Sequence, residues 1–315
     1  MPVFNIHHIT RYQYDRPVKE GVNEIRIYPY PGDEQETLFH EVNITGDPEL
    51  FVFDDYWGNR SGAFNLLPPH REVVIESKLK VRTRSIDKAA FENPTVFTDL
   101  KKEVEGNLQL MELSTMEEAE LHERIESMVG DFKKPGQSVM EFAMACSHYI
   151  FTGFKYLKGI TSIETTVTEI LDHRSGVCQD FAHVMLEILR FMKIPSRYVS
   201  GYICPNKDGM RGVGATHAWV EIWLPGIGWV GIDPTNDIGV TDDHVKLAVG
   251  RNFNDCSPVK GTFKGPAHQS LSIYVSIGYE DGHVFEDITN VKLEEQPGIP
   301  DLVDELKTFA GQQQQ

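Results

Sequence analysis

The sequence predicts an α+β protein in which an antiparallel, sandwich-like β-module precedes a core of helices and further strands. Short runs of alternating apolar and polar residues, separated by Pro and Gly turns, fill about the first ninety residues, as is typical of antiparallel sheets. Apolar residues then recur at helical spacing, and alternation returns from Arg197. A length of 315 residues suggests about two domains. The predicted parts are an N-terminal β-module, an α+β core and a C-terminal tail, at residues 1–90, 91–290 and 291–315.

Individual elements follow from local patterns. Leu38–Ile44 and Val73–Val81 alternate apolar and polar side chains and are predicted strands of the β-module. Ser114 and Ser138 each stand three residues before a Glu. This spacing matches a capping box and predicts a helix start at each Ser. Another long helix begins near Cys178. Later strands are predicted at Arg197–Ile203, Thr216–Leu224, Trp229–Ile232 and Ser270–Tyr279.

Composition disfavours several classes of protein. The chain carries 30 Lys and Arg against 47 Asp and Glu, a formal charge of −17, which disfavours nucleic acid and anionic membranes as partners. No apolar run approaches the roughly 18 residues of a membrane span, and the first residues lack a secretory pattern. We therefore expect a cytoplasmic protein whose 4 Cys are free thiols. The oligomeric state is not indicated.

Cys178 is the first candidate for chemistry. It lies where a glycine-containing loop becomes an amphipathic helix. The unpaired N–H groups and the dipole of a helix N-terminus favour an anion, and a thiolate is such an anion. Gly176 would let a substrate approach the backbone closely. Because Cys is also among the most buried residue types, this segment alone leaves a structural role open.

A predicted β-hairpin supplies two further candidates. Its strands are joined by Pro225–Gly228, and the simplest register places Leu224 opposite Trp229. Asp233 then lies beside or diagonal to His217. A neighbouring carboxylate fixes the tautomer of an imidazole and stabilises its charged form.

Cys178, His217 and Asp233 together have the residue types of a thiol acyl-transfer site. A thiolate attacks an amide or ester carbonyl, and an imidazolium protonates the leaving group. Water or an amine then releases the acyl-enzyme. Either the His or the Asp alone would more often be an ordinary strand residue.

Four spaced motifs resemble those of bacterial transglutaminase-like proteins, which belong to the papain-like, or transglutaminase-like, thiol enzymes. The motifs are GVCQDFAH, IPSRYVSGY, THAWVE and GWVGIDPTN, starting at Gly176, Ile194, Thr216 and Gly228. Other segments are similar to the N-terminal β-domain found with this core and to the segment after it, namely His8–Val18, Asp55–Asn59 and Gly250–Gly261. The resemblance covers most of residues 7–280.

The resemblance implies Cys178 as nucleophile, His217 as base and Asp233 as the orienting carboxylate. It also implies a core in which the nucleophile helix packs on an antiparallel sheet. It leaves the reaction open, because the superfamily includes transglutaminases, peptidases, deglycosylating amidases and inactive scaffolds.

Three further residues are candidates for oxyanion or substrate contacts: Tyr156, Gln179 and Trp219. Relatives use an upstream aromatic or amide side chain as an oxyanion donor, which suggests Tyr156, with packing as the alternative. The backbone N–H of Cys178 is another possible donor. Trp219 would more often pack in the core than line a groove.

We predict neither a cofactor nor a metal. A site made of Cys178, His173 and His183 is disfavoured, because His183 lies about 140° around the helix from Cys178. The sequence also contains no Asp-x-Asp-x-Asp-Gly calcium loop.

The predicted function is thiol-dependent hydrolysis of an amide bond in a peptide or protein, by a cysteine peptidase or amidase. Water is favoured as the acceptor because it is the default nucleophile. A transglutaminase, which transfers the acyl group of a Gln side chain to an amine, is the second possibility. A non-catalytic binding module is the third, and the complete set of three residue types disfavours it. The natural substrate is not indicated.

Overall fold

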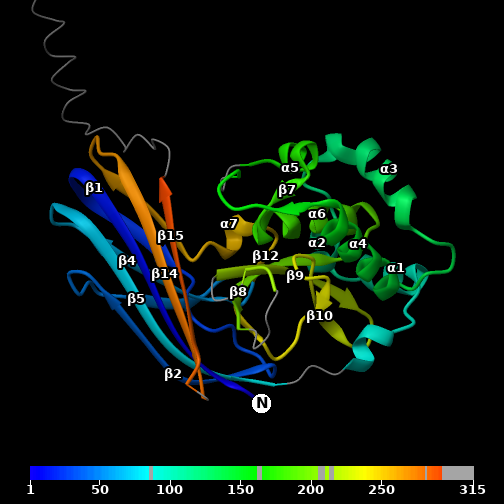
Figure 1. Cartoon of the computed structure of the whole chain (residues 1–315), viewed down its shortest axis with the longest axis horizontal. Coiled ribbons are helices and arrows are strands. Elements are labelled where there is room, and N and C mark those ends of the chain that lie inside the picture. The colour runs from blue at the N-terminus through cyan, green and yellow to red at the C-terminus, as the bar shows by residue number, and fades with distance from the viewer. Residues whose placement is uncertain (85–87, 162–164, 205–209, 213–215, 281, 293–315) are drawn as a thin grey trace, which may run out of the picture. The chain divides into compact units, whose positions relative to one another are not determined.

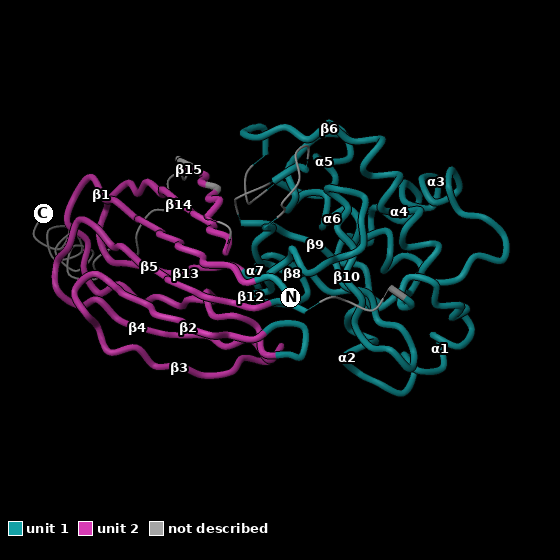
Figure 2. Tube along the Cα trace, turned by 60° about the horizontal axis from the view of Figure 1, so that its bottom comes forward, with its two compact units in different colours: residues 1–2, 32–35, 83–256 teal, residues 3–31, 36–82, 257–315 magenta. Residues whose placement is uncertain are grey.

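The computed structural model describes residues 1–84, 88–161, 165–204, 210–212, 216–280 and 282–292 (Figure 1). Most of the predicted C-terminal tail lies outside these residues. The chain forms two compact units (Figure 2). Unit 1 contains residues 1–2, 32–35 and 83–256, and unit 2 contains residues 3–31, 36–82 and 257–315. Among the described residues, no helix is long and apolar enough to cross a membrane.

Unit 2 is built on one very long strand, β1 (Val3–Ile25). The first half of β1 pairs antiparallel with β5 on one side and β14 on the other, and its second half pairs with β4 and β13. The remaining bounds are β2 Gln35–Ile44, β3 Phe51–Asp54, β4 Arg60–Leu66, β5 His70–Thr83, β13 Val259–Lys264, β14 Gln269–Tyr279 and β15 Val284–Lys292.

The alternation predicted for this module is present. Val73, Ile75, Leu79 and Val81 of β5 are all buried, because side chains two residues apart share one face of a strand. The strands after residue 257 join this unit by pairing with β1. Unit 2 therefore combines strands from the first 82 residues with strands after residue 257, whereas the predicted division ran along the sequence at residue 90.

Unit 1 places helices against an antiparallel sheet whose strand order is β11-β10-β9-β8-β12. Helix α6 (Cys178–Phe191) packs on β8 and β9, and α3, α4 and α5 pack on α6 (Figure 1). The other helices are η1 Lys88–Glu92, α1 Phe97–Glu105, α2 Leu108–Leu113, η2 Ala119–Leu121, α3 His122–Phe132, α4 Val139–Gly153, α5 Val167–His173 and α7 Phe253–Cys256. The strands are β6 Lys155–Tyr156, β7 Ser175–Gly176, β8 Ser196–Ile203, β9 Thr216–Leu224, β10 Gly228–Asp233, β11 Ile238–Gly239 and β12 His244–Gly250.

The predicted α+β class is confirmed, and most predicted elements are present. The capping box at Ser138 forms as expected, because its side chain accepts from Glu141 N–H at 3.1 Å while Glu141 accepts from Ser138 N–H at 2.8 Å. The capping box predicted at Ser114 is wrong. There the hydroxyl donates back to the Met111 carbonyl at 2.9 Å, so that Ser114 ends α2.

The predicted hairpin between β9 and β10 is confirmed, but its register differs by one residue. Trp229 pairs with Trp223 and Gly228 pairs with Leu224. The turn closes early, because Ile227 N–H bonds to the Leu224 carbonyl at 3.1 Å.

Candidate active site

Asp180 holds the loop that precedes Cys178 in place through hydrogen bonds. The Asp180 carboxylate accepts from Val177 N–H and from the Thr161 hydroxyl, both at 2.7 Å. It lies so close to Gly176 that a Cβ on this residue would come within 2.4 Å of Asp180 Oδ2. Only Gly leaves room for this carboxylate, so Gly176 and Asp180 together fix the chain just before Cys178.

Cys178 begins α6, a helix of 14 residues. The first intrahelical bond runs from Phe181 N–H to the Val177 carbonyl at 3.1 Å, so the preceding N–H groups of Cys178 and Gln179 have no partner within the helix. Both side chains are half-buried. Cys178 thus lies beside backbone donors that suit a developing negative charge.

His217 and Asp233 come from the neighbouring strands β9 and β10. His217 Nε2 lies 2.9 Å from Asp233 Oδ2, and both side chains are fully buried. The hairpin brings the two together because the β9–β10 pairing continues to Val220 and Ile232, three residues after His217 and one residue before Asp233. The predicted proximity of His217 to Asp233 is therefore present in the structure.

Asp233 accepts several further hydrogen bonds. Its Oδ1 accepts from Thr235 N–H at 2.9 Å, and its Oδ2 accepts from Asn236 Nδ2 at 2.7 Å. His244 Nε2 lies 3.6 Å from the same Oδ2. A carboxylate held by this many donors has one fixed orientation and remains ionised.

The charge states of the buried pair follow from opposing effects. Burial by itself would lower the pKa of His217, but the charge of Asp233, then that of Cys178, and hydrogen bonds to both outweigh it and raise the pKa to about 10. Burial would raise the pKa of Asp233, but His217 and His244 outweigh it and hold that pKa well below its usual range. His217 is therefore an imidazolium beside a carboxylate at neutral pH.

His217 Nδ1, the nitrogen that does not contact Asp233, is available to the Cys178 thiol. Nδ1 is buried, and no described residue makes a regular hydrogen bond to it. Cys178 is nevertheless near enough to raise the pKa of His217. Since Asp233 occupies Nε2, Nδ1 is the nitrogen left to exchange a proton with sulfur.

Gly212 borders the same imidazole nitrogen. Its φ is +77°, and a Cβ placed there would lie 2.9 Å from His217 Nδ1 and 3.6 Å from the Tyr156 hydroxyl. Asn236 holds this segment, because it accepts from Arg211 N–H at 2.8 Å and donates to the Arg211 carbonyl at 3.2 Å. The same Asn236 amide thus joins the carboxylate of Asp233 to the backbone next to Gly212.

The other predicted contact residues have different surroundings. Tyr156 is half-buried on β6, pairs with Gly176 and places its hydroxyl near Gly212, so the structure brings it to the site. Gln179 follows Cys178 and is half-buried. Trp219 is fully buried, with its ring centroid 6.4 Å from that of His217 and 5.2 Å from that of His244. It packs behind the pair and offers no surface to a substrate.

The remaining cysteines are buried, whereas Cys178 is half-buried. Burial raises the pKa of the Cys146 thiol, and burial together with Asp243 raises that of Cys204. Cys256 makes a 3.7 Å contact with the Tyr198 carbonyl. Of the four thiols, Cys178 is therefore the one placed to react with a solute.

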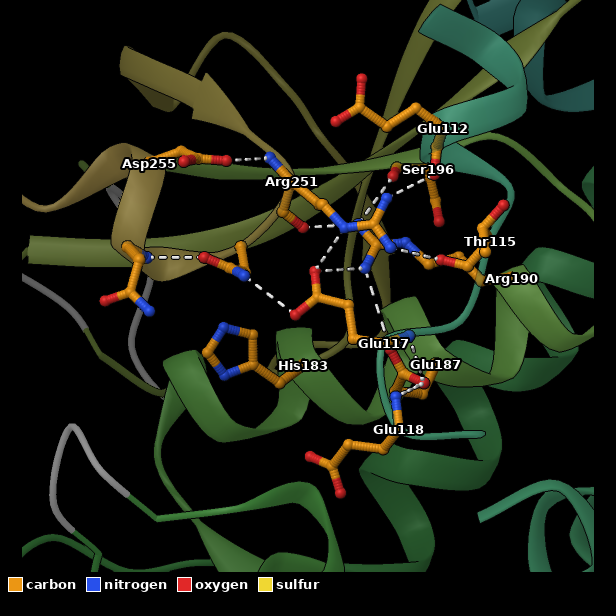
Figure 3. A network of polar contacts seen from close by, with 12 residues as sticks. Glu112, Thr115, Glu117, Glu118, His183, Glu187, Arg190, Ser196, Arg251 and Asp255 are labelled. Carbon is orange, nitrogen blue, oxygen red and sulfur yellow. Dashed lines mark hydrogen bonds and ion pairs between the residues drawn. The ribbon is translucent and has the colours of Figure 1, made fainter. Parts of the chain in front are cut away.

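His183 belongs to a separate polar cluster (Figure 3). Its Nε2 accepts from Phe253 N–H at 3.2 Å, and burial lowers its pKa to about 4. In the same cluster, Glu117 pairs with Arg190 at 3.1 Å and with Arg251 at 3.0 Å. His183, Glu117 and Arg190 line a cavity of about 180 Å³. Their charges pair with one another, which fits a structural role.

Several residues at the site were not predicted from the sequence: Asp180, Gly212, Asn236 and His244. The motif around Cys178 already contained Asp180, and an acidic residue in the first turn of a helix was a usable signal. Asn236 and His244 carried no such signal, because their roles depend on tertiary contacts with Asp233.

Two family profiles match this chain. The profile of the transglutaminase-like superfamily matches residues 126–234, which contain Cys178, His217 and Asp233. The bacterial transglutaminase-like N-terminal region matches residues 4–82. The chain belongs to the transglutaminase-like superfamily.

Relatives within this superfamily include an uncharacterized protein of Mycobacterium leprae, ML0607. It is 30% identical over 273 residues, which are 86% of this chain and 96% of that protein. A protein-glutamine gamma-glutamyltransferase of Pseudomonas aeruginosa is 36% identical over 77 residues, 22% of this chain and 11% of that protein. The crystal structure of a candidate cysteine protease from Cytophaga hutchinsonii superposes with a TM-score of 0.68 at 20% identity, covering 95% of this chain and 94% of that one. This last similarity shows that the two proteins share a fold over most of their length.

Proposed function

We propose that this transglutaminase-like protein is a thiol-dependent amidase that hydrolyses an amide bond in a peptide or protein. The observation that carries the proposal is the buried His217–Asp233 pair, 2.9 Å apart, together with the half-buried Cys178 at the start of α6, which is near enough to raise the pKa of His217. A reducing, cytoplasmic compartment would suit it, because Cys178 must remain a thiol to act.

The first half-reaction forms an acyl-enzyme. In the resting site His217 Nδ1 already holds the proton of Cys178 as part of an imidazolium, and the Cys178 thiolate attacks the carbonyl carbon to form a C–S bond. The backbone N–H groups at the start of α6 and the Tyr156 hydroxyl are the proposed donors to the oxyanion. When the tetrahedral intermediate collapses, the C–N bond breaks and the His217 imidazolium protonates the departing amine.

The second half-reaction releases the acyl group. His217 Nδ1 takes a proton from water, whose oxygen attacks the thioester carbonyl. The C–S bond then breaks, a carboxylic acid leaves, and the Cys178 thiolate and the His217 imidazolium are restored. Asp233 keeps its charge throughout and holds the imidazole through Nε2.

Transglutamination is the second candidate, supported by the local identity with the Pseudomonas aeruginosa gamma-glutamyltransferase over 77 residues. It differs only in the acceptor, since a primary amine would replace water in the second half-reaction. We favour hydrolysis, because water needs no binding site of its own.

One experiment separates these reactions. The purified protein and its Cys178→Ala variant are incubated with a peptide library, with and without a primary amine, and the products are read by mass spectrometry. We expect cleavage with addition of water in the wild-type protein alone. Amine-dependent mass gains would favour transglutamination, and equal product from the Cys178→Ala variant would exclude the mechanism.

A chemical control tests the site without a substrate. Iodoacetamide should label Cys178 faster than the buried Cys146, Cys204 and Cys256. Equal labelling of all four thiols would contradict the assignment of Cys178 as nucleophile.

A further inference from the structure

We propose that His244 is a positioning residue of the active site, which donates a hydrogen bond from Nε2 to the carboxylate of Asp233 and holds it for His217. This inference rests on the proposed thiol mechanism and adds a residue to it. His244 begins β12, and its side chain is fully buried. Among the described residues, no group makes a regular hydrogen bond to its buried Nε2, and Asp233 Oδ2 lies 3.6 Å from this nitrogen, within ion-pair distance.

The tautomer of His244 follows from its other nitrogen. Thr241 N–H donates to His244 Nδ1 at 3.3 Å. A backbone N–H can only donate, so Nδ1 must be the acceptor and carry a lone pair. In the neutral imidazole the proton is then on Nε2, which points at the carboxylate.

A proton on His244 Nε2 also bears on whether His217, Asp233 and His244 form a hydrogen-bonded cluster or a metal site. The ligand atoms of His217, Asp233 and His244 lie within 4.8 Å of one another, an arrangement that could hold a metal ion. A metal at His244 Nε2 would need the lone pair of that nitrogen, and the proton would then have to move to Nδ1, against the Thr241 N–H. The hydrogen bond to Nδ1 therefore favours a donor over a ligand.

Packing holds the imidazole in this direction. The ring of Trp219 meets His244 edge to face, with centroids 5.2 Å apart and planes at 78°. Trp219 is fully buried and also lies against His217. The two imidazoles therefore approach one carboxylate oxygen from β9 and β12, the strands on either side of β8, with their ring centroids 6.2 Å apart and the indole packed against both.

A matched pair of variants isolates the hydrogen bond. Gln can place an N–H donor near the position of His Nε2, whereas Met has a similar shape and no donor. We expect His244→Met to lower the rate constant for alkylation of Cys178 by iodoacetamide about tenfold, since a hydrogen bond to a charged group is lost. His244→Gln should stay within about threefold of the wild type. Equal rates in the two variants, whether high or low, would overturn the proposal.

Two NMR measurements keep the test independent of folding defects and of the substrate. In the wild-type protein, the nitrogen shifts of His244 should report a proton on Nε2, and a proton on Nδ1 would overturn the proposal. The proton between His217 and Asp233 should resonate far downfield, remain in His244→Gln and shift or vanish in His244→Met. If the wild type shows neither this proton nor selective labelling of Cys178, the proposed function itself fails.

Discussion

Asp233 determines the charge of His217 at the scale of single residues. Both side chains are fully buried, and burial alone would favour a neutral imidazole. The adjacent carboxylate is the largest influence that opposes this effect. Because the pKa of His217 is raised to about 10, the imidazolium that must protonate the leaving amine persists through neutral and mildly alkaline pH and is lost as the pH rises through that value.

Asp233→Asn should therefore lower activity and move its alkaline limb to lower pH. The amide keeps the shape but removes the charge, so the pKa of His217 falls toward the value that burial favours. We expect turnover to drop roughly 100-fold or more, measured as kcat/KM against pH for any amide that the wild type cleaves. An unchanged alkaline limb would show that another group controls it.

Gly212 is a second residue whose identity the site requires. Gly212→Ala would place a Cβ 2.9 Å from His217 Nδ1 at a φ of +77°, and we expect about a tenfold loss of Cys178 alkylation rate. Gly226→Ala is the matched control, since Gly226 has a φ of +76° and no heavy atom of another described residue lies within 4 Å of its Cβ position. Similar losses in both variants would assign the effect to backbone strain.

The sequence predicts the three residues of the candidate triad but not the other residues that contact Asp233. The order Cys178, His217, Asp233 and the hairpin could be read from local pattern. Asn236 and His244 could not, because an Asn after a strand and a His at the start of one are common. The roles of Asn236 and His244 depend on their contacts with Asp233, and these contacts form only in the tertiary structure.

The start of α6 is the element on which the site depends. Gly176, Val177 and Asp180 form a closed unit in which the carboxylate bonds the Val177 N–H at 2.7 Å and fills the space of a Gly176 side chain. Gly176→Ala should push the carboxylate away and displace Cys178, lowering its alkylation rate about 10- to 100-fold.

Gly130→Ala, in α3, is the control for this change, since no neighbouring heavy atom lies within 4 Å of the added Cβ. We expect it to leave the rate unchanged and to stabilise the helix slightly. A Gly176→Ala variant that reacts like the wild type would show that the loop adapts without moving the thiol.

The helix start predicted at Ser114 is wrong because the backbone donors that follow it have another partner. Ser114 and Ser138 have the same spacing to a Glu, yet only Ser138 caps a helix. The N–H groups of Glu117 and Glu118 instead bond the carboxylate of Glu187, at 3.1 and 3.3 Å. A partner 70 residues away thus satisfies the donors that a local capping box would have used.

At the scale of the whole molecule, unit 2 is closed by the C-terminal part of the chain. β14 pairs with β1 from Phe4 to Tyr14, and its Val275 and Ile277 are buried. The local pattern of residues 1–90 could not show this, because alternation reveals a strand but not its neighbour. Pairing over such a sequence separation is decided by the whole sheet.

A chain truncated after Cys256 tests this closure. Without β13, β14 and β15, β1 loses the partner on one side of its first half and becomes an exposed edge that favours aggregation. We expect the melting temperature to fall by about 10 °C or more, and proteolysis to cut within residues 3–82 before residues 83–256. A chain ending at Lys292, which keeps every described strand, is the control and should melt like the full-length protein. If the chain ending at Cys256 melts like the full-length protein and resists cleavage in residues 3–82, then residues 1–90 form a self-sufficient module and the later strands only cover it.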